Sequence, residues 1–130
     1  MYKIEKRPSG YLLTFGGTIT SDEMTAWFGE SRTALKGAVP PFGVIIDMRT
    51  LAPLAPETQA IMVEGQKAFM TAGMKRSCVI VANSIIAMQF KRLAKESGIY
   101  AFERYIDAEA HPDWTKTAVA WVKDGTDPDA

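Results

Sequence analysis

The chain is poor in the two side chains that build most disulfides and zinc sites. It has one cysteine, Cys78, and one histidine, His111. A single cysteine cannot form an internal disulfide, and one residue of each type is too few for a structural zinc site. The segment Met1–Arg7 is charged and strand-like, without the apolar core of a signal peptide. We therefore expect a cytoplasmic protein that binds no metal.

The chain also lacks an excess of charge and any long apolar run. Fifteen basic residues balance fifteen acidic ones, so no global positive field attracts nucleic acid. The apolar run Cys78–Ala82 is far shorter than the ~20 residues that cross a bilayer. We expect neither a nucleic-acid partner nor a transmembrane segment.

Motifs for cofactors and catalysis are missing as well. Gly16-Gly17 lacks the third glycine of a phosphate-binding loop, and Asp22 and Glu23 at the following helix start would repel a phosphate. Cys78 lies inside an apolar strand, where burial raises the pKa of a thiol, and His111 is far from it in the sequence. The sequence therefore predicts no cofactor, no catalytic residue and a protein that is not an enzyme.

What the chain does contain is enough apolar side chains for one core, arranged in short segments. Of its 130 residues 47% are hydrophobic, which fits one globular domain. Tyr2–Lys6 and Tyr11–Gly16, separated by Pro8–Gly10, predict a β-hairpin. Thr20–Glu23 has the pattern of a capping box and predicts a helix start, and Gly37 is expected to end that helix in a left-handed conformation.

Two apolar runs predict the middle of a sheet. Val44–Ile46 and Ser77–Ala82 are apolar on successive positions, as in parallel strands that are covered on both faces. Asp47 is expected to end the first strand, and Pro56 to open a helix that Gly73 closes. The residues of this helix expected to be buried are Ile61, Gly65, Ala68, Phe69 and Ala72. Those expected to be exposed are Glu57, Glu64, Gln66 and Lys67.

The last third of the chain predicts two more helices around an outer strand. Asn83 and Ser84 are good N-caps for a helix that ends at Gly98. The expected buried stripe of that helix is Ile86, Phe90, Leu93 and Ala94. Tyr100–Ile106 alternates as an outer strand does, with Glu103 on the side away from the apolar residues. The stripe of the last helix is Trp114, Ala118, Trp121 and Val122.

Together these elements predict one α/β domain over residues 1–123 and a flexible polar tail over residues 124–130. The expected fold is a mixed, mostly parallel sheet with an N-terminal β-hairpin and about four helices, whose crossovers are right-handed.

In open α/β sheets, ligands bind outside the carboxyl ends of the parallel strands. The ends of the two predicted central strands carry Asp47–Thr50, which includes Arg49 and Thr50, and Asn83-Ser84, and we expect them to converge at one rim. In the alternative interpretation, Asp47 caps loop amides and Arg49 pairs with a nearby acid. The amides at Asn83-Ser84 likewise either hold an anion or are only capped.

The helix after Asn83 also carries a basic face, formed by Lys91, Arg92 and Lys95 and partly offset by Glu96. Such a face is either simply solvated or docks an acidic partner or a lipid head group, at ~1 kcal/mol per cation near an anionic membrane. The methionines, which include Met62, Met70, Met74 and Met88, either form an adaptable binding surface or, as we expect by default, fill gaps in the core.

Four segments resemble the SpoIIAA-like branch of the STAS superfamily. They are Ile45–Leu51, the helix from Pro56, the strand before Asn83 and the segment Ala87–Gly98, and the likeness covers nearly the whole chain. The resemblance implies a sheet with an N-terminal hairpin and parallel strands, packed by helices, and a role in binding partners. The related CRAL-TRIO-like lipid carriers share a similar core, which keeps a ligand-binding alternative.

The chain also differs from that family at one position that the family uses for regulation. In sporulation-type anti-sigma factor antagonists, an Asp-Ser-Ser-Gly helix start carries a phosphorylated serine. Aligned from Asp47, that start falls at Ala55–Thr58, so that Pro56 takes the acceptor position and Glu57 the next one. Thr50 and Thr58 are the nearest hydroxyls. The phosphorylation switch is not expected here, whereas binding through the same surface is retained. Glu57 and Thr58 therefore join Asp47, Arg49, Thr50, Asn83 and Ser84 as candidate binding residues of the rim.

These observations predict a non-enzymatic interaction or regulatory domain that forms a homodimer. The dimer is expected because Trp27, Trp114 and Trp121 lie on the first and last helices, whose outer edges a small sheet does not fully cover. The alternative is a carrier or sensor of a lipid or other small apolar ligand. An interaction domain predicts a helix surface more apolar than its own core needs, a carrier predicts a large pocket, and an enzyme predicts clustered acids or bases with shifted pKa values.

Overall fold

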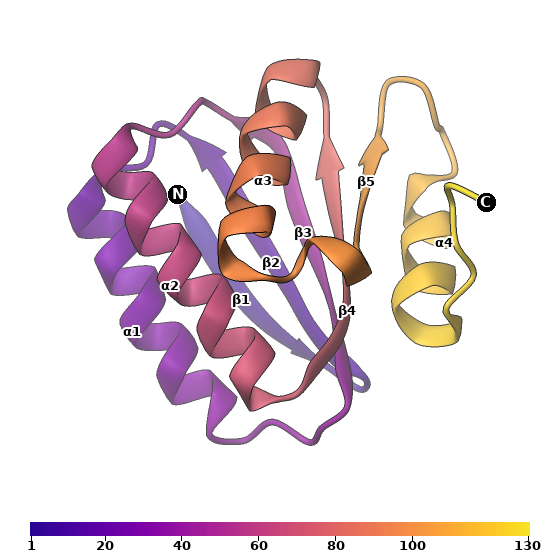
Figure 1. Ribbon diagram of the computed structural model, residues 1–130, viewed down its shortest axis with the longest axis horizontal. Helices are drawn as coiled ribbons and strands as arrows, with labels where there is room; N and C mark the ends of the chain where they lie inside the picture. Colours follow the sequence, from indigo (N-terminus) through magenta and orange to yellow (C-terminus); the bar gives the residue numbers. More distant parts are fainter.

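A five-stranded sheet in the order β1-β2-β3-β4-β5 forms the centre of the computed structural model, which describes residues 1–130 (Figure 1). The strands are β1 (Tyr2–Arg7), β2 (Gly10–Gly17), β3 (Phe42–Leu51), β4 (Met74–Val81) and β5 (Glu103–Asp107). β1 and β2 pair antiparallel, and every other neighbouring pair is parallel. The mixed, mostly parallel sheet and the N-terminal hairpin are therefore confirmed.

Helices cover the sheet unequally on its two faces. Those on the first face are α1 (Ser21–Leu35), α2 (Pro56–Ala72) and α3 (Ser84–Ser97). The second face has only the short α4 (Trp114–Val119) and the π-helical turn η2 (Ala120–Asp124), which lie over β4, β5 and part of β3 (Figure 1). The four helices are as expected, and none of them combines the length and apolar character that a bilayer crossing requires.

Alternate residues of β4 enter two separate cores. Val79 and Val81 join the large core under α1, α2 and α3, whereas Cys78 and Ile80 join a small core under α4. β4 is thus covered on both faces, as predicted. β3 is covered on one face only in part, because α4 does not extend over it and Ile45 stays half-buried.

The large core is organised around the Trp27 indole. Its ring meets Phe15 edge-on at 5.2 Å between centroids and stacks on Phe69 at 6.1 Å. Gly65 of α2 allows this position, since a Cβ there would lie 2.1 Å from Cζ3 of the indole. α1 and α2 can therefore pack closely across the tryptophan.

Most predicted helix ends are confirmed, with one exception. The Thr20 hydroxyl accepts a hydrogen bond from the Glu23 amide at 3.1 Å, and Gly73 and Gly98 end α2 and α3 in the left-handed conformation. The Gly37 prediction is wrong, because α1 ends at Lys36 in a right-handed conformation. The carbonyl of Gly37 instead accepts a hydrogen bond from the Lys6 ammonium at 3.0 Å.

The end of β3 and the start of β5 also differ from expectation. β3 does not end at Asp47 but continues to Leu51, because Gly16 and Gly17 of β2 extend the pairing there. The segment Tyr100–Phe102 is a 3₁₀ turn, η1, so β5 begins only at Glu103. Neither difference changes the alternation of side chains between the two faces, so Asp47 stays opposite Ile46 and Met48, and Glu103 stays opposite Ile106.

The polar tail folds back onto the second face of the sheet. Gly125 closes η2 in the left-handed conformation, and Asp127 is bonded to Arg104 of β5. Residues 124–130, expected to be loose, lie against β5 and η2 in the structure (Figure 1).

Candidate functional site

The starts of α2 and α3 lie side by side at the carboxyl ends of β3 and β4. Asn83 caps α3 by accepting the Ile86 amide at 2.9 Å. The loop before α2 is tied to both helices through Leu54, whose amide donates to Gln89 Oε1 and whose carbonyl accepts from Gln59 Nε2, both at 2.8 Å. These bonds make one continuous surface, which we call the α2–α3 rim. Its defining residues are Glu57, Asn83, Ser84, Ile85 and Met88.

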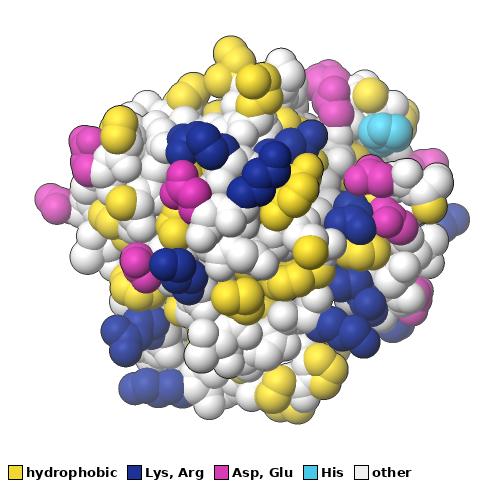
Figure 2. Space-filling model, in the orientation of Figure 1, with side chains coloured by type: hydrophobic (Ala, Val, Ile, Leu, Met, Phe, Trp, Pro, Cys, Tyr) yellow, Lys and Arg dark blue, Asp and Glu magenta, His cyan; other side chains and the backbone are white.

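Two large apolar side chains on this rim are exposed to solvent. Ile85 is 64% exposed and Met88 is 70% exposed, three positions apart on α3, whereas Ile86 between them is fully buried. Figure 2 shows yellow apolar groups gathered at the top of the molecule, over the start of α3. The sequence prediction had assigned Ile86 to the core correctly but placed Met88 with the core-filling methionines.

The basic face predicted on α3 continues from the rim along the same helix. Lys91 lies over the Tyr105 ring at 5.4 Å and Lys95 over the Tyr100 ring at 4.8 Å. Arg92 turns toward α2, where it bonds Gln59, and pairs with Glu96 at 3.0 Å. Figure 2 shows dark-blue cations next to yellow side chains on this side of the molecule. The cations are thus partly engaged by aromatic rings and one acid.

Only some of the residues predicted to form the binding rim lie at the α2–α3 rim in the structure. Glu57, Asn83 and Ser84 are exposed there. Thr58, in contrast, is buried and shares a 2.9 Å hydrogen bond with the Ser21 hydroxyl. Thr50 is exposed near the end of β3, beside Gly16 of β2.

Asp47 and Arg49 do not converge with the rim, because β3 continues past them and their side chains project from its other face. The Asp47 carboxylate accepts two hydrogen bonds from the Arg49 guanidinium, at 3.0 and 2.9 Å, and one from the Arg49 amide at 3.1 Å. Burial tends to raise the pKa of Asp47, but these bonds and the Arg49 charge outweigh burial and lower it. This is the alternative interpretation of the pair, with Asp47 bonding a local amide and the nearby cation.

The pair borders a groove between the uncovered part of the sheet and α4. The groove has a volume of about 500 Å³, and the Arg49 guanidinium lies 4.6 Å from the centre of the Trp114 ring at its edge. Leu12 and Ile45 form part of its apolar lining, and Arg7 and Lys123 add two further cations. This volume is within the range of small-molecule sites.

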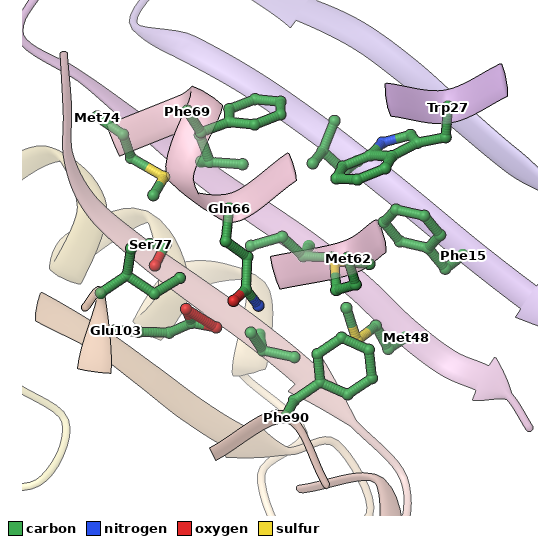
Figure 3. Close-up of a pocket in the computed structure, with 15 residues that line it drawn as sticks. Phe15, Trp27, Met48, Met62, Gln66, Phe69, Met74, Ser77, Phe90 and Glu103 are labelled. Atoms are coloured by element: carbon green, nitrogen blue, oxygen red, sulfur yellow. The ribbon is translucent and has the colours of Figure 1, made fainter. Parts of the chain in front are cut away.

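A much smaller cavity, of about 30 Å³, lies in the large core between the sheet and its three covering helices (Figure 3), and it extends to the place where α2, β4 and β5 meet. The side chains of Gln66, Ser77 and Glu103 reach it from these three elements, and an oxygen of each has no hydrogen-bond partner. Burial raises the pKa of Glu103 to about 8, although the neighbouring Ser77 and Tyr105 hydroxyls oppose the shift.

The sequence analysis missed this cluster because it placed polar side chains at solvent-exposed positions. Gln66 was expected on the exposed side of α2, and Glu103 on the exposed side of an outer strand that began at Tyr100. The turn η1 shifts the start of β5, and the parallel pairing of Glu103 with Ser77 then directs the carboxyl into the core. No local signal in the sequence marks either residue as buried.

The one thiol of the chain is shielded from solvent. Cys78 is fully buried in the small core, and burial raises the pKa of its thiol to about 12. Its side chain faces α4, whereas Ser77 and Glu103 face α2, so the thiol is not part of the core cavity.

Neither the known protein-family models nor the curated proteins include a match for this chain. The resemblance to the STAS superfamily is therefore an expectation from the sequence pattern, and the fold rests on the structure alone.

Proposed function

We propose that this chain is a non-enzymatic interaction domain that binds a partner protein through the α2–α3 rim. The observation that carries the proposal is the exposure of Ile85 and Met88, since an interaction domain is expected to have a helix more apolar than its own core needs. Complete burial of two such side chains is worth about 1.5–3 kcal/mol each. The pair therefore supplies the anchor of a modest interface.

The charges along α3 define the partner's chemistry. Lys91, Arg92 and Lys95 follow the apolar pair on the same helix, against the single acid Glu96. A complementary partner presents an apolar pocket or helix face with acidic residues beside it, because opposite charges steer the encounter and set its orientation.

The STAS resemblance supports the same surface and argues against a phosphorylation switch in it. Pro56 has no hydroxyl, and the hydroxyl of Thr58 is buried and bonded to Ser21. We therefore expect no phosphate at the start of α2 after incubation with ATP and a serine kinase of the anti-sigma type. Stoichiometric phosphorylation mapped to Thr58 would contradict this.

Selection of displayed ten-residue peptides on the purified protein tests the proposal. We expect acidic, aliphatic peptides to be enriched, and Ile85→Ser with Met88→Ser to weaken their binding at least tenfold. Val39→Ser is the matched control, because Val39 is 78% exposed at a site remote from the rim, and it should leave binding unchanged. Peptides that bind the double variant as tightly as the wild type would refute the proposal.

The homodimer expected from the sequence remains a prediction, but its contact surface changes from the tryptophans to the α2–α3 rim. Trp27 and Trp121 are buried within one subunit and Trp114 is half-buried, so the tryptophans no longer argue for a dimer. If two copies associate, Ile85 and Met88 are the side chains that they would cover. Sedimentation equilibrium at micromolar concentrations decides, since a mass of 14.3 kDa throughout means that the rim binds a different protein. The cytoplasmic location likewise stays a prediction.

The ligand-carrier alternative keeps one supporting observation, the groove of about 500 Å³ at α4. The core cavity, at about 30 Å³, is too small for a lipid. A titration with laurate, followed by the amide NMR signals of Ile45 and Val119, tests this alternative. Saturable shifts confined to the groove would favour a carrier, and unchanged signals would exclude it for this ligand.

A further inference from the structure

Three buried oxygen atoms without partners meet at the core cavity. They are Oε1 of Gln66, Oγ of Ser77 and Oε2 of Glu103. The exposed fractions of these residues are 8%, 0% and 3%. Buried polar groups in proteins are nearly always hydrogen-bonded, to protein or to ordered water, so three such atoms at one place indicate a missing partner.

The fold brings the three side chains together from separate elements. Ser77 of β4 and Glu103 of β5 are register partners in a parallel pair, so their side chains leave the same face of the sheet next to each other. Gln66 reaches the same point from α2, which crosses above (Figure 3). Of the 15 lining residues 12 are hydrophobic, and the one further unpaired polar group among them is the indole N–H of Trp27 on α1.

The size of the cavity limits what fills it. A water molecule needs about 10–15 Å³ of such space and two to four polar partners. The cavity offers about 30 Å³ and three oxygen atoms, and it excludes any organic ligand. We propose that one water molecule occupies this cavity and bridges Gln66, Ser77 and Glu103.

Each of the three oxygen atoms gains one hydrogen bond when Glu103 is the neutral acid. Its O–H then donates to the water, and the water donates to Gln66 Oε1 and to Ser77 Oγ. A neutral acid also suits the apolar lining, and burial holds the pKa of this carboxyl near 8. The bridge joins α2 to the β4–β5 edge at a place where no hydrogen bond of normal geometry pairs the three oxygen atoms, although the Ser77 and Tyr105 hydroxyls lie close enough to lower the pKa of Glu103.

The surrounding charges do not provide a competing partner. On the outer side of Glu103, a pocket of about 230 Å³ is lined by Lys91, Arg104 and Asp129 together with Tyr100 and Tyr105. The Arg104 guanidinium is engaged by Asp127, and no ion pair joins Glu103 to either cation. Glu103 thus separates the cavity from this outer pocket, which offers water a short path to the surface.

A crystal structure at about 1.2 Å resolution, grown at pH 6 without ammonium salts, tests the proposal. We expect one isolated density peak within hydrogen-bond distance, about 2.7–3.2 Å, of all three oxygen atoms. An empty cavity, or a direct Glu103–Ser77 hydrogen bond that closes it, would overturn the proposal. A peak that forms only with added ammonium would also overturn it, because the ligand would then be a cation held by an ionised Glu103.

NMR provides a second test in solution. We expect water-to-protein nuclear Overhauser effects at the side-chain amide of Gln66 in the wild type and in Ser31→Ala, and their loss in Ser77→Ala. Ser31 is the matched control because it is a fully buried serine, also unpaired, that does not line the cavity. Absence of the effect in the wild type would contradict the bridge, whatever the variants do.

Discussion

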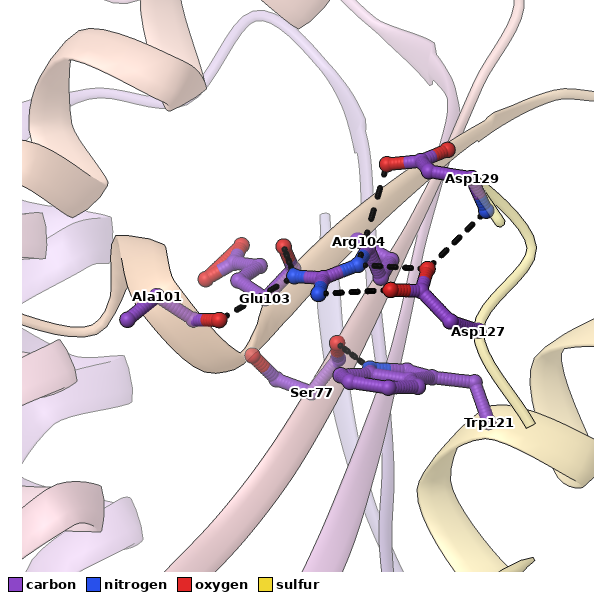
Figure 4. A network of polar contacts seen from close by, with 7 residues as sticks. All are labelled: Ser77, Ala101, Glu103, Arg104, Trp121, Asp127 and Asp129. Carbon is purple, nitrogen blue, oxygen red and sulfur yellow. Dashed lines mark hydrogen bonds and ion pairs between the residues drawn. The ribbon is translucent and has the colours of Figure 1, made fainter. Parts of the chain in front are cut away.

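The Arg104 guanidinium and the Asp127 carboxylate form two hydrogen bonds, at 2.8 and 3.0 Å, that join β5 to the polar tail (Figure 4). The same guanidinium lies 4.3 Å from the Trp121 ring, whose indole N–H donates to the Ser77 carbonyl at 2.9 Å. Hydrogen bonding to Arg104 lowers the pKa of Asp127 to about 2, so the pair is charged at all ordinary pH values. Arg104 thus holds the tail on β5, whereas η2 is also held by Arg76, which donates to the Lys123 carbonyl at 3.4 Å and lies 5.6 Å from the Trp121 ring.

We expect Arg104→Ala to release the tail. Loss of the charge-assisted bonds and of the contact with Trp121 should lower the free energy of unfolding. Limited proteolysis should then cleave the segment after Asp124 faster than in the wild type. Lys116→Ala, at an exposed position of α4, is the control. Equal cleavage rates in both variants would show that Arg104 does not hold the tail.

The buried carboxyl of Glu103 should make the protein less stable as pH rises. Its pKa is about 8 in the folded state against an ordinary value of 4.5, so between these values the folded state holds a proton that the unfolded state has lost. The contribution of Glu103 to the free energy of unfolding is therefore fully present below about pH 4.5. It is lost as pH rises toward 8, by on the order of a few kcal/mol.

Glu103→Gln tests this prediction, because it replaces the titratable carboxyl by a neutral amide and should remove the pH dependence. We expect it to match the wild type in denaturant unfolding near pH 4.5 and to exceed it in stability at pH 8. Glu109→Gln, at an exposed position, should follow the wild type throughout. A wild type whose stability is flat over this range would mean that Glu103 ionises without penalty.

Local signals account for the parts of the fold that the sequence predicted well. The Thr20 and Asn83 caps, the left-handed Gly73 and Gly98, and the apolar runs of β3 and β4 depend on neighbouring residues and on burial alone. These signals were sufficient for the order of the elements and for the type of sheet.

The errors concern residues whose position depends on distant pairing. Asp47 and Arg49 left the predicted rim because β2 extends β3 by pairing up to Leu51. Glu103 entered the core because its pairing with Ser77, and not its polarity, decides its face. The exposure of Ile85 was missed for the opposite reason, since an apolar side chain in a helix gives no sign that nothing covers it.

Ile85 and Ile86 are adjacent, yet their truncation should have opposite consequences. Ile86→Ala leaves a void in the fully packed core and should cost about 2–5 kcal/mol of stability. Ile85→Ala should change stability by less than about 0.5 kcal/mol, because its side chain is largely in water. Urea unfolding measures both. A large loss in Ile85→Ala would show that the rim is structural and would weaken its assignment as a binding surface.

Cys78 should not react with thiol reagents in the native protein. A pKa near 12 leaves almost no thiolate at pH 8, and α4 covers the side chain. We expect iodoacetamide to modify the protein in 6 M guanidinium chloride but not under native conditions at the same pH. Native modification at a comparable rate would mean that α4 opens readily, which would revise the description of the small core.

Two glycines inside helices should respond in opposite ways to the same substitution. A Cβ at Gly65 would lie 2.1 and 2.2 Å from two atoms of the Trp27 ring, which cannot move aside because Phe15 and Phe69 flank it. Gly65→Ala should therefore destabilise the protein by about 1–3 kcal/mol or more. Gly29 of α1 has nothing within 4 Å of its Cβ position and is exposed, so Gly29→Ala should add about 0.5–1 kcal/mol through helix propensity. Denaturant midpoints give both values, and a neutral Gly65→Ala would show that α1 and α2 pack less closely across Trp27 than the structure has them.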